Sequence, residues 1–260
     1  RYTHGKYAKI STYVFNSKEK LMKKKNIIGY IKFVDNDFIE NFYELNSLWL
    51  SEISAFTENS EEVADNLIDD PHEGKLENIS LDMPAFITCF TELTSDSFDK
   101  DGILNKDISD ALIKCEEKLH KNRDFIFIPS QNMQSLLDNI NNAQHGETEG
   151  ELSHTKVFAR KVLYKADYSN KMRLLEEKFW AGNASMEEDI GKAVLQTKDE
   201  RYKPQNEFRI GVVLQHKKEE WEKKHKNVKG LSIKLVPSIH FAKCRFKRES
   251  LRTLSTTQLQ

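Results

Sequence analysis

Cysteine is scarce in this chain of 260 residues, which has only Cys89, Cys115 and Cys244. An odd number of cysteines far apart in sequence cannot all pair, and reduced thiols in a cytoplasmic protein are the simplest interpretation. A zinc site is not indicated, because Cys115 and His120 have no second pair of ligands nearby. No apolar run approaches the length of a membrane-spanning helix, and the first residues lack the apolar region of a signal peptide.

The common glycine-rich motifs are also missing. The chain contains no Gly-x-x-x-x-Gly-Lys and no Gly-x-Gly-x-x-Gly, which argues against P-loop and Rossmann nucleotide binding. It contains no Gly-x-Ser-x-Gly, and its histidines have no serine or cysteine partner at a recognisable spacing. The usual hydrolase arrangements are therefore not predicted.

Charged residues make up 31% of the chain and hydrophobic residues 38%, a balance typical of a water-exposed globular protein that buries its own core. The net charge of −1 hides a strong asymmetry. Residues 51–120 hold 18 acidic against 5 basic side chains, whereas residues 201–250 hold 14 basic against 5 acidic ones. The basic segment would attract a polyanion such as nucleic acid; the alternative is that both segments are ordinary solvated faces.

Hydrophobic periodicity predicts an α+β fold, because strand patterns follow one another too often for a doubly wound sheet. Residues 1–260 are expected to form one domain, with the loop at residues 144–151 as its best hinge candidate. Strands are expected at residues 12–15 and 27–33 (as a hairpin), 86–91, 125–128, 157–164, 205–214, 231–236 and 239–246. Helices are expected at residues 37–54, 107–119, 130–140, 172–180 and 185–194.

The most informative segment is residues 201–214, where a loop ended by Pro204 leads into a strand that opens with Gln-x-Glu-x-Arg. Side chains on an extended backbone alternate, so Gln205, Glu207 and Arg209 should share one face while the residues between them point into a core. One interpretation is a solvated pair of charges, which contributes about 0.2–1 kcal/mol. The other is a functional carboxylate that stabilises a developing positive charge.

A second strand pattern, at residues 84–92, alternates strictly. It places Thr88 between two phenylalanines on one face, and Cys89 and Thr91 on the other. Two threonines on a short strand favour the functional interpretation of the Gln-x-Glu segment.

Three segments together resemble a bacterial family of uncharacterised proteins. That family has a Cys-Phe-Ser-Glu strand, a strand ending in Val-x-Tyr, and a late Lys…Trp-x-Tyr-Glu-x-Glu-Tyr-Arg signature. The matching segments here are Cys89-Phe90-Thr91-Glu92, Val162-Leu163-Tyr164, and Lys198 followed by Tyr202-Lys203-Pro204-Gln205-Asn206-Glu207-Phe208-Arg209. The resemblance covers roughly residues 84–240, with a gap in its middle. The family's Trp-x-x-Tyr is missing, Thr91 replaces serine, and Gln205 replaces glutamate.

The order of these motifs is similar to that of the ADP-ribosyltransferase superfamily. The resemblance implies a split, mostly antiparallel sheet flanked by helices, and an enzyme that cleaves NAD and passes ADP-ribose to a macromolecule. It implies that Glu207 is the catalytic carboxylate and that Gln205 orients the acceptor. In that superfamily Glu-x-Glu tends to go with arginine acceptors and Gln-x-Glu with other acceptors, so Gln205 argues against arginine. A nearby guanidinium such as Arg209 would keep the carboxylate ionised.

The resemblance also implies which residues hold NAD and which partners the protein has. Thr88 and Thr91 would shape the nicotinamide pocket, and Arg1 and Tyr2 would hold the dinucleotide, since a guanidinium binds phosphate oxygens in pairs. The acceptor would be RNA, DNA or protein. Bacterial enzymes of this kind often act as toxins or anti-phage effectors, so the resemblance implies an antitoxin protein as a partner.

Two other functions stay open at the level of sequence. The chain could be a binding module that kept the scaffold without catalysis, and the lysine-rich residues 217–229 could then contact nucleic acid through Trp221. The same residues equally suit a solvated helix. The acidic loop with Asp96, Asp99 and Asp101 could belong to a metal-dependent nuclease or be an ordinary flexible loop.

Overall fold

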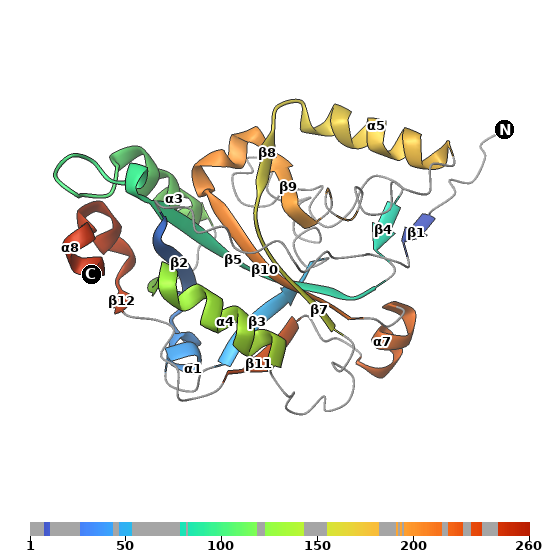
Figure 1. Ribbon diagram of the computed structural model, residues 1–260, viewed down its shortest axis with the longest axis horizontal. Coiled ribbons are helices and arrows are strands. Elements are labelled where there is room, and N and C mark those ends of the chain that lie inside the picture. The colour runs from blue at the N-terminus through green and yellow to red at the C-terminus, as the bar shows by residue number, and fades with distance from the viewer. Residues whose placement is uncertain are drawn as a thin grey trace.

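The computed structural model describes residues 8–10, 27–43, 47–53, 79–81, 83–118, 123–142, 155–181, 191, 193, 195–214, 218–225, 230–235 and 244–260 (Figure 1). The strands are β1 (Ala8–Ile10), β2 (Ile27–Asp35), β3 (Ser47–Glu52), β4 (Ile79–Leu81), β5 (Ala85–Thr94), β6 (Arg123–Pro129), β7 (Thr155–Lys161), β8 (Leu163–Lys165), β9 (Thr197–Asp199), β10 (Glu207–Leu214), β11 (Gly230–Lys234) and β12 (Cys244–Phe246). The α-helices are α1 (Ile39–Tyr43), α3 (Lys106–Lys118), α4 (Ser130–Asn142), α5 (Tyr168–Trp180), α7 (Lys218–Lys224) and α8 (Thr256–Leu259), and the 3-10 helices are η1 (Ser95–Ser97), η3 (Glu200–Gln205) and η4 (Arg248–Thr253).

An 8-stranded, antiparallel sheet forms the centre of the described structure, and β5 is its branching strand. Along one edge of β5 runs β10, which pairs from Glu207↔Thr91 to Val213↔Ala85. The other edge is shared, because β3 pairs at Ile87 and β2 pairs from Thr91 onward. The sheet therefore divides at β5, with β3 and β11 on one branch and β2, β6 and β12 on the other. The expected α+β fold with a mostly antiparallel sheet is confirmed.

The two faces of the sheet bury separate apolar clusters. One face packs against α4, α1 and α7, and Figure 1 shows α4 lying across the strands. The opposite face carries two clusters: the first lies under α5, and the second lies under α3, η4 and α8. Alternation along β5 assigns the faces, since Phe86 and Phe90 belong to the α4 side whereas Ile87 and Leu93 belong to the other.

The helix predicted at residues 37–54 is wrong for most of its length. The helical segment α1 is short, and β3 follows it with Leu48 and Leu50 buried and Trp49 54% exposed. The spacing of the apolar residues in this segment fits both a helical repeat and the two-residue repeat of a strand. Pairing with β5 and β11 stabilises the strand.

Other sequence expectations agree with the described structure. Strand β2 contains residues 27–33, α5 contains residues 172–180, and α7 lies within the charged residues 217–229. Trp221 on α7 is buried, with its ring against Phe86, so it is not available to stack on a nucleic-acid base. The expected strand at residues 12–15, the hinge loop at 144–151 and the start of the helix at 185–194 lie outside the described residues.

Candidate functional site

A belt of polar side chains separates the two apolar clusters on the α5 side of the sheet. On the strands it consists of Cys89 and Thr91 from β5 and Glu207 and Arg209 from β10, which face one another in register. We call these four residues and the side chains that contact them the polar belt. The predicted alternation of β5 and β10 is confirmed here, because Phe208 packs into the cluster on the opposite face.

Glu207 is the centre of the polar belt. Its Oε1 accepts a hydrogen bond of 2.6 Å from Nε of Arg209, and its Oε2 lies 2.8 Å from Nζ of Lys198. Glu207 and Lys198 are each 4% exposed and Arg209 is 0% exposed, so these charges have no direct access to bulk water. The interpretation of Glu207 and Arg209 as a solvated surface pair is therefore wrong.

The electrostatics of the polar belt keep Glu207 ionised. Burial alone would raise the pKa of Glu207, but the charges of Arg209 and Lys198 and hydrogen bonds from Arg209 and Cys89 lower it well below its ordinary value. Burial and the nearby carboxylate both raise the pKa of Tyr164, so this phenol stays protonated. The belt thus holds one anion between two cations, with a neutral phenol beside them.

Tyr164 and Lys198 bring two further strands, β8 and β9, to Glu207. The backbone N–H of Glu207 donates to the Tyr164 hydroxyl over 2.7 Å, and Lys198 approaches from β9. Both residues occur in the quoted motifs, but the sequence predicted no role for either. The only signal was their place in the motif order, since neither periodicity nor composition indicates a buried lysine.

Gln205 lies next to the polar belt, although not as predicted. It ends η3 rather than opening the strand, because Asn206 adopts a left-handed conformation (φ 43°) between η3 and β10. Its side-chain oxygen is 3.4 Å from Nζ of Lys198, and its amide nitrogen is 4.0 Å from Sγ of Cys115 on α3. A lysine therefore connects Gln205 to Glu207, whereas the prediction relied on strand alternation.

Thr88 and Thr91 point to opposite faces of the sheet. Thr91 belongs to the polar belt, opposite Glu207. Thr88 lies on the α4 side, where its hydroxyl is 2.6 Å from Nζ of Lys32. The two threonines therefore cannot line one pocket, and Thr88 is separated from Glu207 by the sheet.

Arg1 and Tyr2 lie outside the described residues. Asp99 uses its side chain within its own loop, where Oδ1 accepts from the backbone N–H groups of Asp101 and Ile103. In the described part of the chain, no three His, Cys, Asp or Glu side chains are grouped closely enough to hold a metal ion. No described helix is both long and apolar enough to cross a lipid bilayer.

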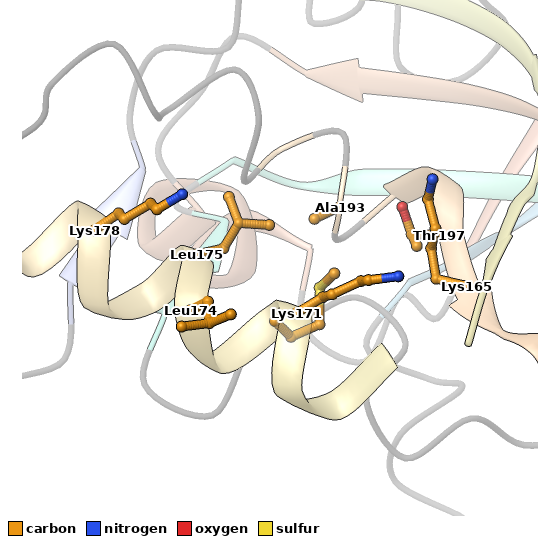
Figure 2. Close-up of a pocket in the computed structure, with 8 residues that line it drawn as sticks. Lys165, Lys171, Leu174, Leu175, Lys178, Ala193 and Thr197 are labelled. Carbon is orange, nitrogen blue, oxygen red and sulfur yellow. The ribbon is translucent and has the colours of Figure 1, made fainter. Parts of the chain in front are cut away.

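A hollow of about 390 Å³ lies between α5 and β8–β9 (Figure 2). Thr197 of β9 lines it, and the next residue, Lys198, contacts Glu207. Successive side chains of a strand point to opposite sides, so the hollow and the carboxylate lie on different sides of β9. The hollow is therefore not the pocket of the polar belt. Its lining residues are Lys165, Lys171, Met172, Leu174, Leu175, Lys178, Ala193 and Thr197.

Comparison of the chain with protein-family models, with curated proteins and with solved structures found no match.

Proposed function

We propose that the protein is an NAD-dependent ADP-ribosyltransferase in which Glu207 acts on the ribose that carries nicotinamide. The main support is a buried, ionised carboxylate held between Lys198 of β9 and Arg209 of β10, with Tyr164 of β8 bound to the backbone N–H of the same residue. Buried ion pairs stabilise folded proteins poorly, because desolvation of the charges offsets much of their attraction. A cluster of this kind with a strongly shifted pKa is therefore more typical of a functional site than of a structural one.

The donor set of the polar belt suits the sugar end of NAD. Cleavage breaks the bond between ribose C1′ and the nicotinamide nitrogen, and the electron pair leaves with neutral nicotinamide. Positive charge then develops on the ribose, and a carboxylate held ionised by Arg209 and Lys198 would stabilise it. A nucleophilic atom of the acceptor forms the new bond to C1′ and releases its proton.

Lys198 is the residue that must rearrange in this proposal. Glu207 is only 4% exposed and a cation lies against each of its carboxylate oxygens, so a ribose hydroxyl can reach it only when one of these covering side chains moves. Arg209 is anchored because its Nη1 also donates to the carbonyl of Leu195 over 3.0 Å. Lys198 shares its ammonium group between Glu207 and Gln205, the latter at 3.4 Å, and is the easier partner to displace.

The test compares two variants that differ only at the carboxylate. NAD labelled in its adenylate phosphate is incubated with the protein and with RNA, DNA or protein extract, and both nicotinamide release and label transfer are followed. Lys198→Met keeps Glu207, whereas the double variant Lys198→Met/Glu207→Gln lacks its charge and keeps its shape. We expect turnover by the first and at least about 100-fold less by the second. Equal turnover by both would falsify the role of Glu207.

A second candidate function is a binding module without catalysis, for nucleic acid or protein. The observation that favours it is the burial of Glu207, which is only 4% exposed and has a cation against each carboxylate oxygen, as a structural ion pair would also have. The same incubation separates the two functions. A module would retain nucleic acid or protein in a salt-sensitive complex and release no nicotinamide.

A further inference from the structure

The hollow beside α5 combines positive charge with an apolar floor. Lys171 and Lys178 lie on one face of α5 seven residues apart, which places their backbones about 10.5 Å apart along the helix. Lys165 reaches the hollow from β8 on the other side. Figure 2 shows the three lysines following one another along the hollow, with Lys165 beside Thr197.

The floor of the hollow is formed by buried apolar residues. Met172 is 9% exposed and Ala193 is 4% exposed, and Leu175 lies between the two flanking lysines of α5. None of the described residues that line the hollow carries a carboxylate, so its lysines have no acidic partner among them. Lys171 instead donates from Nζ to the carbonyl of Ala166 over 2.9 Å, which holds its ammonium group at the rim.

We propose that this hollow is a binding site for a free nucleotide, with the base on the apolar floor and the phosphates against the lysines. A volume of about 390 Å³ is within the range of small-molecule sites. Ammonium groups bind phosphate as point charges, and a flat aromatic base is the part of the ligand that an apolar floor accepts. The buried Thr197 adds one hydroxyl between floor and rim.

The site is distinct from the polar belt and does not depend on the proposed function. Thr197 faces the hollow while Lys198 faces Glu207, so the backbone of β9 separates the two. A variant at the rim leaves the contacts of Glu207 intact, and a variant at Glu207 leaves the lysines intact. Binding at each place can therefore be removed separately.

The experiment measures binding to the whole chain by titration calorimetry at low salt, with ADP, adenosine and inorganic pyrophosphate as probes. We expect ADP to bind with a Kd below about 1 mM, and adenosine and pyrophosphate to bind at least about 10-fold more weakly, because each lacks one half of the ligand. The double variant Lys165→Gln/Lys171→Gln should bind ADP at least about 10-fold more weakly, because contacts to the phosphates are lost. The double variant Lys100→Gln/Lys114→Gln, at two exposed lysines that do not line the hollow, serves as the matched charge control and should bind ADP as the parent does.

Each other result would overturn the proposal. If ADP binding is unchanged in the lysine double variant but lost in Lys198→Met/Glu207→Gln, the nucleotide binds in the polar belt instead. If pyrophosphate binds as tightly as ADP, the apolar floor plays no part. If single-stranded RNA binds far more tightly than ADP and is displaced only by other RNA, the lysines serve a strand and not a free nucleotide. Absence of ADP binding at millimolar concentration also rejects the site.

Discussion

The ammonium group of Lys198 lies 2.8 Å from the carboxylate of Glu207, and both side chains are almost completely buried. The pair joins β9, which lies outside the 8-stranded sheet, to the first residue of its strand β10. Lys198 therefore stabilises the charge of Glu207 and also fixes β9 against the sheet.

The first prediction concerns the stability of the polar belt. Glu207→Gln leaves Arg209 and Lys198 buried without their anion, so it should lower the free energy of unfolding by about 3–5 kcal/mol. Lys198→Met added to it removes one uncompensated charge and should recover about 2 kcal/mol. Urea unfolding of the parent, Glu207→Gln and Lys198→Met/Glu207→Gln measures both effects. An unchanged unfolding midpoint for Glu207→Gln would contradict this prediction.

The second prediction is the acid sensitivity of the same carboxylate. The pKa of Glu207 is lowered by folding, so its contribution to stability is present above the ordinary value of 4.5 and is lost as pH falls toward the folded value. The parent should lose more stability between pH 5 and pH 3 than Lys198→Met/Glu207→Gln, which cannot take up that proton. Parallel curves of unfolding free energy against pH for the two proteins would contradict the shift.

The third prediction concerns Lys32 on the other face of the sheet. Burial is the main cause that lowers the pKa of Lys32 from 10.5 to about 8; the charge of Arg123 also lowers it, whereas Cys89 and Glu116 raise it by smaller amounts. Between these two values the unfolded chain binds more protons at this position, so stability should rise with pH there. Relative to Lys32→Met, the parent should gain about 2 kcal/mol between pH 7.5 and 9.5. The difference is read from urea unfolding at both pH values, and a constant difference rejects the assignment.

The fourth prediction uses the close approach of Gly211 and Phe158. These residues are directly opposite each other on β10 and β7, and a Cβ at Gly211 would lie 2.1 Å from the Phe158 ring. Gly211→Ala should therefore destabilise the fold by about 1–3 kcal/mol through overpacking. In a double-mutant cycle with Phe158→Leu, the two changes should couple by at least about 0.5 kcal/mol. Strict additivity would show that the ring moves aside without cost.

The sequence predicted the central strands well because alternation there is strong. β5 and β10 each place apolar residues on one face with period two, so the side of Thr91 and Glu207 followed from local pattern. The left-handed residue Asn206 was not predicted, and it removes Gln205 from the strand. The helix predicted for residues 47–52 was wrong because the local pattern is compatible with a helix, whereas pairing with distant strands makes the segment a strand.

The partners of Glu207 were only half predicted. Arg209 is two residues away on the same strand, so its contact follows from strand geometry. Lys198 and Tyr164 contact Glu207 through the packing of β8 and β9 against the sheet, which no local pattern encodes. The lysine-lined hollow was missed as well, because Lys165 joins Lys171 and Lys178 only after β8 and α5 pack together.

The branching of the sheet at β5 has a consequence for synthesis of the chain on the ribosome. One edge of β5 pairs with β2 and β3, which are synthesised before it. The other edge pairs with β10, which is synthesised more than a hundred residues later. At roughly 5–20 residues per second, that edge stays unpaired for several seconds or longer and offers bare N–H and C=O groups to any other strand. Until residues 207–214 emerge, this edge of a nascent chain is therefore open to pairing with strands of other chains.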